Sequence, residues 1–235
     1  MLVLDHLSVA FGVVRPIDRL NLTVSAPTHG VIGPNGAGKT TLLNTLNGFI
    51  TPVAGTMEAF GTRLDTMAVR RRARWGLRRT FQTEQLAEDL SIGGNIAVAL
   101  DHCPAHRGRG VSEAAELVGL EGLDRPVAEL TTVERRLTEI ARAVVGEPRL
   151  VLMDEPAAGV SGDDRRALVE VLSRIQSETG AWVVIIDHDV ELISAVCETT
   201  TALDFGSLIA TGPTADVLAD PAVAEVYLGG LGVGS

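Results

Sequence analysis

The chain has 235 residues, which is long enough for one large α/β domain with an inserted lobe, because single hydrophobic cores stop growing near about 250–300 residues. Its formal net charge of −10 argues against nucleic acid as a partner, since general binding of phosphates needs a positive face. No run approaches the roughly 20 apolar residues of a membrane-spanning helix, and no export signal opens the sequence. We therefore expect a soluble, cytoplasmic protein.

The first part of the chain predicts strands that lead into a helix. Val and Leu are frequent and partly alternate in residues 2–9 and 20–24, and residues 28–32 form a short apolar strand before a glycine-rich turn. A helix is expected from Thr40 to Asn47. Beyond Pro52, the pattern predicts three further elements: a strand at 56–60, a helix at 64–74 and a strand that enters a loop at 79–81.

The rest of the chain predicts a helical segment and then an alternation of strands and helices. Between residues 84 and 130 there is no strong strand signal, only helical patches at 92–100 and 112–118. Strands at 149–153 and 181–187 then alternate with helices at 132–145 and 163–178, a last strand covers 199–203, and a C-terminal helix starts at Thr214. This alternation predicts parallel βαβ units.

One segment matches the phosphate-binding P-loop pattern GxxxxGK[ST] and reads Gly33-Pro34-Asn35-Gly36-Ala37-Gly38-Lys39-Thr40. Glycines let consecutive backbone N–H groups turn toward phosphate oxygens, and a helix N-terminus adds partial positive charge. We expect Lys39 to bridge the β- and γ-phosphates of ATP and the Thr40 hydroxyl to hold Mg²⁺. Lys39 is the only lysine among 20 basic residues, which indicates a role that arginine cannot fill. The expected nucleotide-binding residues here are Gly33, Asn35, Gly36, Gly38, Lys39, Thr40 and Thr41.

A second motif is an apolar strand that ends in two adjacent carboxylates, Leu150-Val151-Leu152-Met153-Asp154-Glu155. A buried strand tolerates such charges only at its exit. We expect Asp154 to hold Mg²⁺ and Glu155 to polarise the attacking water. Alone, this pattern could also be a surface turn; the upstream P-loop favours the catalytic interpretation.

Together these motifs resemble the ABC (ATP-binding cassette) ATPase family over nearly the whole chain. The resemblance implies an α/β fold with a P-loop ABC-cassette core, an N-terminal antiparallel β subdomain and an inserted helical lobe. It implies one domain of residues 1–235, in which 1–82 and 131–235 form the nucleotide-binding core and 83–130 the lobe. It also implies ATP and Mg²⁺ as cofactors.

The resemblance assigns roles to three further residues. Gln82 matches the glutamine of the family's Q-loop, which contacts Mg²⁺ and water and relays the nucleotide state to a membrane subunit. His188 matches the switch histidine that contacts the γ-phosphate, so Glu155, His188 and Gln82 form the expected catalytic set. Phe11 lies where the family places an aromatic residue on adenine, although a core phenylalanine is the alternative.

One family motif is altered. The signature, Leu-Ser-Gly-Gly-Gln or Leu-Ser-Tyr-Gly-Glu in the family, is replaced here by Leu130 followed by Thr131, Thr132, Val133 and Glu134. In the family, this segment of one cassette closes on the ATP held by a second. The β-branched Val133 would hinder close backbone approach to phosphate and disfavours positive φ.

The detailed pattern resembles the LivG/BraG-type ATPases of branched-chain amino acid importers, on the segments Arg79–Gln82, Asp154–Gly159, Asp187–Asp189 and Val226–Gly229. This implies an ATPase on the inner face of the cell membrane that powers import of a small solute. The implied partners are transmembrane permease subunits, a second ATPase subunit in a hetero- or homodimer, and indirectly a solute-binding protein. Urea importers and lipopolysaccharide exporters share much of the pattern and are alternatives, as is a nucleotide-binding module with little hydrolysis.

Overall fold

The computed structural model describes residues 1–103 and 108–229. It is an α/β structure that divides into two compact units. Unit 1 comprises Met1–Arg72 and Val184–Ser235, and unit 2 comprises Ala73–Val183. Among the helices in the described ranges, none is long and apolar enough to span a membrane. The boundaries expected for the helical lobe, 83 and 130, stay a prediction.

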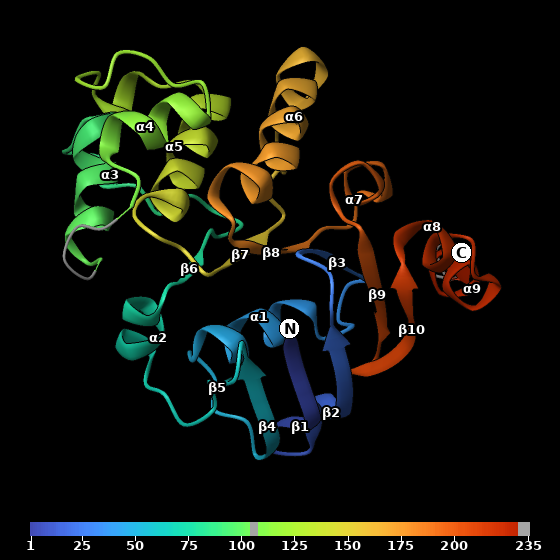
Figure 1. The fold of residues 1–235 in the computed structure, drawn as a ribbon. Coiled ribbons are helices and arrows are strands. Elements are labelled where there is room, and N and C mark those ends of the chain that lie inside the picture. The colour runs from blue at the N-terminus through green and yellow to red at the C-terminus, as the bar shows by residue number, and fades with distance from the viewer. Residues whose placement is uncertain (104–107, 230–235) are drawn as a thin grey trace. The chain divides into compact units, whose positions relative to one another are not determined.

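Unit 1 contains an antiparallel sheet with the strand order β2-β1-β4-β5 (Figure 1). Its strands are β1 (Leu2–Phe11), β2 (Val14–Val24), β4 (Ala54–Ala59) and β5 (Thr62–Arg63). Leu2 lies opposite Val24 on one side and Ala59 on the other, and the alternating Leu2 and Leu4 are buried. One face of the sheet therefore packs on the core. The antiparallel pairing of β1 with β2 and β4 confirms the antiparallel sheet expected near the N-terminus. The short strand β5 was not predicted.

A second group of strands in unit 1 carries the P-loop. It contains β3 (Thr28–Ile32), β9 (Thr199–Asp204) and β10 (Ser207–Pro213). β3 and β9 are parallel, with Val31 opposite Thr201, whereas β9 and β10 form an antiparallel hairpin. β10 was not predicted, because its exposed, mixed sequence lacks the apolar signal of a core strand.

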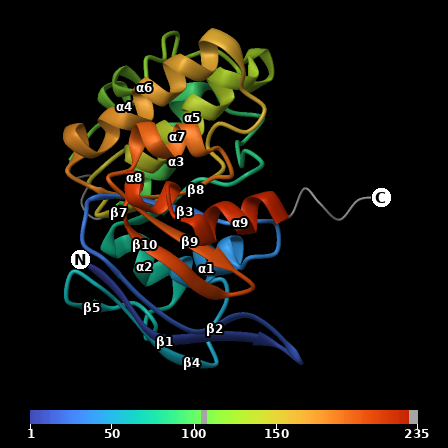
Figure 2. The same cartoon turned by 90° about the vertical axis from the view of Figure 1, so that its right-hand side faces the viewer.

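Four helices also belong to unit 1: α1 (Lys39–Asn47), α7 (Val190–Val196), α8 (Thr214–Leu218) and α9 (Pro221–Gly229). α8 packs against β9 and β10, and α9 against β10 (Figure 2). The predictions for α1 and α8 are confirmed, whereas α7 was not predicted.

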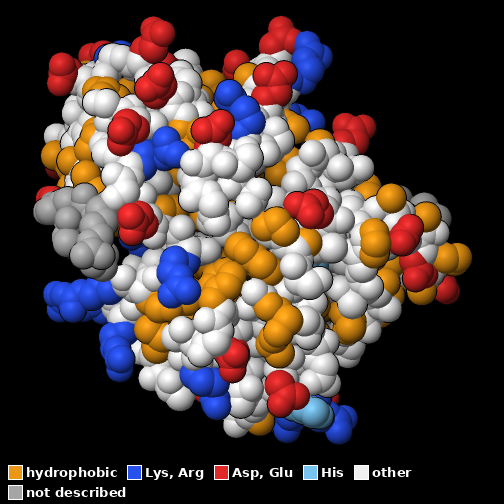
Figure 3. Space-filling view, in the orientation of Figure 1, with side chains coloured by type: hydrophobic (Ala, Val, Ile, Leu, Met, Phe, Trp, Pro, Cys, Tyr) orange, Lys and Arg blue, Asp and Glu red, His pale blue; other side chains and the backbone are white. Residues whose placement is uncertain are grey.

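The Arg-rich helix α2 (Val69–Trp75) begins five residues after the predicted start at Leu64, so that prediction is wrong at its N-terminal end. The Leu64 N–H donates to the Met57 carbonyl, and Asp65 accepts from the Met57 N–H at 2.9 Å, so this stretch extends the sheet edge instead. Arg70, Arg71 and Arg74 are exposed, whereas Arg72 is buried. Basic side chains accordingly gather over α2, on the left in Figure 3.

Unit 2 contains two parallel strands, β6 (Leu77–Arg79) and β7 (Leu150–Asp154), with Leu77 opposite Leu150. Its helices are α3 (Ile92–Asp101), α4 (Val111–Leu117), α5 (Thr132–Val144) and α6 (Gly162–Thr179), with a short 3₁₀ turn at Val127–Glu129. α3, α4 and α5 pack against one another (Figure 1). The predicted helical patches and the strand before the two carboxylates are therefore confirmed. The chain passes between the units twice, within α2 and within β8 (Trp182–Ile186).

Candidate functional site

The P-loop joins β3 to α1, and close backbone packing explains two of its glycines. Gly33 has a φ of 150°, and a Cβ there would lie 2.2 Å from the Leu203 carbonyl oxygen. Gly38 has a φ of 99°, and its Cβ would lie 2.2 Å from the Pro16 carbonyl oxygen. No side chain fits at such distances, so both positions require glycine on steric as well as conformational grounds.

Lys39 is the first residue of α1, and its buried ammonium group lies against the loop it follows. Nζ donates to the Gly33 carbonyl at 2.7 Å and to the Pro34 carbonyl at 3.0 Å. The positive charge is thereby fixed beside the backbone of the P-loop. Thr40 and Thr41 follow in the first turn of α1, and Asn35 and Gly36 are exposed at the tip of the loop. Unit 1 thus combines a cation, hydroxyl groups and a helix N-terminus at one place, a combination suited to phosphate.

Phe11 is the last residue of β1, opposite Val14 in the hairpin with β2. Its side chain is 54% exposed, so it is not the core residue that was the alternative at this position. An exposed ring at a strand end is available for stacking on a planar ligand.

His188 lies in the turn between β8 and α7. Its side chain is 68% exposed, and Nδ1 lies 3.6 Å from Oδ1 of the buried Asp187. Asp187 accepts from the Asp189 N–H at 2.9 Å, and Asp189 in turn caps α7 by accepting from Glu191 and Leu192. The turn that carries His188 is therefore anchored on both sides while the imidazole stays exposed.

In unit 2, the structure brings Gln82 and Glu155 together, although 73 positions separate them in the sequence. Gln82 Nε2 donates to Glu155 Oε2 at 3.0 Å. Glu155 directly follows β7 and has a φ of 46°, a region that non-glycine residues seldom adopt. Strained backbone of this kind persists where surrounding structure enforces it and is frequent at functional sites.

Asp154, the last residue of β7, is buried and paired with Arg79, the last residue of the neighbouring strand β6. Arg79 Nη2 lies 3.0 Å from Asp154 Oδ2. Arg79 opens the Arg79–Gln82 segment, but the sequence predicted no role for it. Its role follows from its place at the end of β6, which pairs in parallel with β7 and so brings Arg79 near Asp154.

Two residues that the sequence analysis missed hold the loop that carries Gln82. Arg136 in α5 donates to the Phe81 carbonyl at 2.8 Å and to the Gln82 carbonyl at 3.0 Å. Glu139, one turn further along α5, accepts from the Phe81 N–H at 2.9 Å and pairs with Arg136 at 3.0 Å. Burial raises the pKa of Glu139 above its ordinary value. Their i, i+3 spacing was the only sequence signal for this network.

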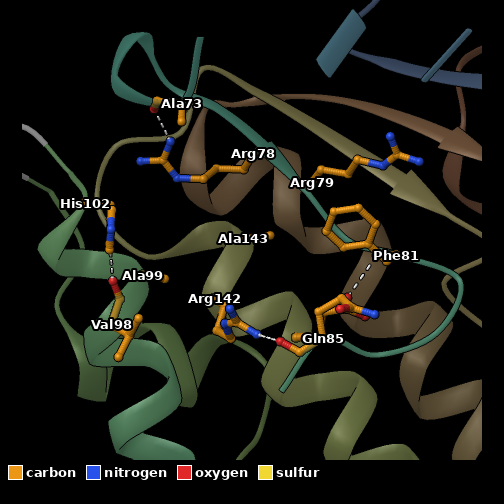
Figure 4. Close-up of a pocket in the computed structure, with 11 residues that line it drawn as sticks. Ala73, Arg78, Arg79, Phe81, Gln85, Val98, Ala99, His102, Arg142 and Ala143 are labelled. Atoms are coloured by element: carbon orange, nitrogen blue, oxygen red, sulfur yellow. Dashed lines mark hydrogen bonds between the residues drawn. The ribbon is translucent and has the colours of Figure 1, made fainter. Parts of the chain in front are cut away.

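A pocket of about 280 Å³ opens beside this loop within unit 2 (Figure 4). Its lining includes Phe81 from the loop, Val98 from α3 and Arg142 from α5. Arg142 donates to the Gln85 carbonyl and the Phe81 N–H donates to Glu139, so hydrogen bonds within the lining hold these residues in place. The pocket therefore lies next to the loop that carries Gln82.

The altered signature segment forms the start of α5. Thr131 is the N-cap residue: its hydroxyl accepts from the Glu134 N–H at 3.3 Å, and Glu134 accepts from the Thr131 N–H at 2.8 Å. Arg125 also contacts Glu134, at 2.5 Å. Thr132 and Val133 lie in the first helical turn, so position 133 has no need of a positive φ. The conformational objection to Val133 is therefore wrong, and only the steric one stands.

Comparisons with known proteins identify the family. The sequence profile of the ABC transporter family matches residues 17–158, which include the P-loop and the Asp154–Glu155 motif. The chain belongs to the ABC transporter family. A second profile, described as branched-chain amino acid ATP-binding cassette transporter, matches residues 207–231 of this cassette.

Curated relatives align with the cassette over nearly its whole length. The high-affinity branched-chain amino acid transport ATP-binding proteins LivG of Salmonella typhimurium and BraF of Pseudomonas aeruginosa are each 30% identical, over 97% of this chain and 98% of theirs. The methionine import ATP-binding protein MetN 1 of Burkholderia ambifaria is 32% identical over 94% of this chain and 67% of its own.

Solved structures confirm the ABC cassette fold. MJ1267, an ATP-binding cassette of an ABC transporter, has a TM-score of 0.84 at 26% identity and aligns with 97% of this chain and 98% of its own. A dimer of the cassette MJ0796 bound to ADP and Pi has a TM-score of 0.79 at 19% identity, covering 91% and 99%. The chain is thus an ATP-binding subunit of ABC transporters and an ATPase.

Proposed function

We propose that this ATPase powers the import of branched-chain amino acids. The observation that carries the proposal is the 30% identity to LivG and BraF over 97% of the chain, supported by the C-terminal profile at 207–231. The relative MetN 1 is named for methionine import, so amino acids are the common substrate class among these relatives. ATPases of urea importers and of lipopolysaccharide exporters are the competing assignments.

Within unit 1, the P-loop residues would bind the ATP phosphates. Backbone N–H groups of Gly33, Asn35, Gly36 and Gly38 would surround the phosphate oxygens, and Lys39 would neutralise them. The Lys39 ammonium is already held at 2.7 Å from the loop backbone, so little side-chain entropy remains to be lost on binding. Thr41 would contact phosphate from the first turn of α1, and Phe11 would stack on adenine.

The remaining site residues would act on the γ-phosphate. Thr40, Gln82 and Asp154 offer the hard oxygen ligands that Mg²⁺ prefers, and bound Mg²⁺ would neutralise charge that develops on the phosphates. Glu155, held at 3.0 Å from Gln82, would orient and polarise the attacking water. The exposed His188 would contact the γ-phosphate.

We further propose that the cassette pairs with a second ATPase chain, its own copy or a different one. Thr131, Thr132, Val133 and Glu134 would approach ATP held by that partner. The Thr131 hydroxyl and the N-terminus of α5 favour an anion, but the Val133 side chain stands where the family has glycine. A site completed by this segment would bind ATP and hydrolyse it slowly. Unchanged dimerisation and turnover in a V133G variant of the heterodimer would contradict this.

In the cell, the cassette would lie on the cytoplasmic face of the membrane, bound to permease subunits. A solute-binding protein would contact the complex only through those permeases. Nucleic acid is not expected as a partner, because the net charge is −10.

The test is uptake by the complete importer. We expect proteoliposomes that contain the cassette, its permeases and the solute-binding protein to accumulate radiolabelled leucine with ATP inside, and to fail with K39A or E155Q. E155Q should still bind ATP, and light scattering of this variant with Mg-ATP would show whether the chain dimerises by itself. ATP-dependent uptake of urea, or export of a lipid, in place of leucine uptake would overturn the assignment.

A further inference from the structure

The turn between β9 and β10 is joined to the P-loop by its backbone. The Gly206 N–H donates to the Ala37 carbonyl at 3.0 Å, and the Gly206 carbonyl accepts from the Asp18 N–H at 3.2 Å. All three residues belong to unit 1. Because β9 runs parallel to β3, with Ile32 opposite Ala202, the turn after β9 lies at the same end of the strands as the P-loop after β3.

The approach at this point is too close for any side chain. Gly206 has a φ of 77°, and a Cβ there would lie 2.6 Å from the Pro16 carbonyl oxygen. A Cβ at Gly38 would lie 2.2 Å from the same oxygen. That Cβ would also lie 3.6 Å from the Cα of Gly206. The backbones of β2, the P-loop and the β9–β10 turn thus meet at Pro16, Gly38 and Gly206.

Phe205, the residue before Gly206, has a strained backbone, and its exposed side chain gains little packing energy in return. Phe205 has a φ of 42°, and its side chain is 84% exposed. A bulky residue adopts this conformation only where its surroundings impose it. Phe205 and Gly206 form the two-residue loop of the hairpin in which Asp204 pairs with Ser207, and a loop of this length favours positive φ at both positions.

We propose that Gly206 is a positioning residue for ATP binding, which acts through the Ala37 carbonyl. A trans peptide is planar, so the C=O of Ala37 and the N–H of Gly38 point in opposite directions. When the Ala37 carbonyl is fixed toward Gly206, the Gly38 N–H is aimed to the other side, into the loop. The turn thereby sets the direction of a phosphate-binding donor. This inference rests on the proposed role of the P-loop.

The experiment compares two glycine variants of β10 and its turn. G206A introduces a Cβ against the Pro16 carbonyl, whereas a Cβ at Gly212 would meet only the Val217 side chain, at 4.0 Å. Alanine keeps the backbone N–H, but its Cβ at 2.6 Å from the Pro16 oxygen would displace the turn and break the bond to Ala37. We therefore expect G206A to raise the Kd for ATP on the order of 10-fold and to raise KM more than it lowers kcat. G212A should stay within about 2-fold of the parent chain.

Two further variants separate the alternatives. Glycine adopts a positive φ without strain, so F205G removes the strain at position 205 and leaves the Gly206 N–H in place. Its Kd for ATP should therefore match that of the parent chain. K39A tests the P-loop itself: if K39A binds ATP normally, the assignment of the P-loop fails, whereas normal binding by G206A alone overturns only the role of Gly206. A thermal midpoint for each variant shows whether it is folded at the assay temperature.

If G206A does not fold, amide hydrogen exchange of the unchanged chain decides. We expect the Gly206 amide to exchange slowly for a turn and more slowly still with bound ATP, because the nucleotide orders the loop that carries its acceptor. Exchange as fast as that of an exposed turn amide, or no change on ATP binding, would overturn the proposal.

Discussion

Arg79 and Asp154 form a buried ion pair, in which Nη2 lies 3.0 Å from Oδ2 and the side chains are only 4% and 6% exposed. The two residues end the adjacent parallel strands β6 and β7, so strand pairing fixes their separation. Arg79 also lies over the Phe81 ring, 4.9 Å from its centroid. A cation of the chain itself therefore holds the carboxylate that we propose as a Mg²⁺ ligand.

Removing Arg79 should destabilise the fold strongly. In R79A the Asp154 carboxylate would remain buried without this cation, and breaking a buried pair from one side costs about 3–5 kcal/mol. Urea denaturation at neutral pH measures the loss. The matched control is R63A, whose partner Asp65 lies in a half-exposed pair at 2.6 Å, and which should change the midpoint far less. Equal effects of the two variants would contradict the larger cost expected for the buried Arg79–Asp154 pair.

Local sequence signals were enough to predict the elements that carry the site, but not the contacts between them. The P-loop stands between β3 and α1 as expected, since glycine spacing and a following helix are local signals. The pairing of Gln82 with Glu155 depends on how β6 and β7 align, which no local pattern encodes. The start of α2 was misplaced because Leu64 bonds to Met57 across a sheet edge, so tertiary contacts overrode the helical preference.

The positive φ of Glu155 predicts that glycine at this position is more stable than alanine, the reverse of the usual order. E155A and E155G both remove the contact with Gln82 and should both abolish ATP turnover. Glycine accepts the φ of 46° without cost, whereas alanine does not, so we expect E155G to be more stable than E155A by about 1 kcal/mol. Chemical denaturation of the two variants measures the difference. With an unstrained backbone at position 155, alanine would be the more stable residue, so that order would contradict the strain.

Acid should weaken the start of α5. Arg125, and then the Thr131 backbone N–H, hold the pKa of Glu134 down to about 2. A carboxyl whose folded pKa is depressed stabilises the fold above its unfolded pKa and loses this effect as the pH falls through the folded pKa. We therefore expect stability to fall between about pH 5 and pH 2, and part of this slope to vanish in E134Q. A slope that is unchanged in E134Q would show that other groups account for it.

The buried His29 predicts a second pH dependence, at higher pH. His29 lies on β3 with 1% of its surface exposed, and its ring nitrogens contact the Thr199 hydroxyl at 2.8 Å and the Thr201 hydroxyl at 2.9 Å. Each hydroxyl can donate or accept, so a neutral ring is fully satisfied. Burial lowers the pKa of His29 to about 4, so the folded protein disfavours the charged ring.

The sign of the effect follows from proton linkage. Between pH 6.5 and 4 the unfolded chain binds a proton at residue 29 that the folded chain does not, so stability rises with pH. The full contribution is present above the unfolded pKa of about 6.5 and is lost as the pH falls through 4, for a total of about 3 kcal/mol. Urea denaturation from pH 7.5 to 4 should therefore show a slope that H29Q lacks. The control H6Q replaces an exposed histidine and should keep the slope; loss of the slope in H6Q would place its origin elsewhere.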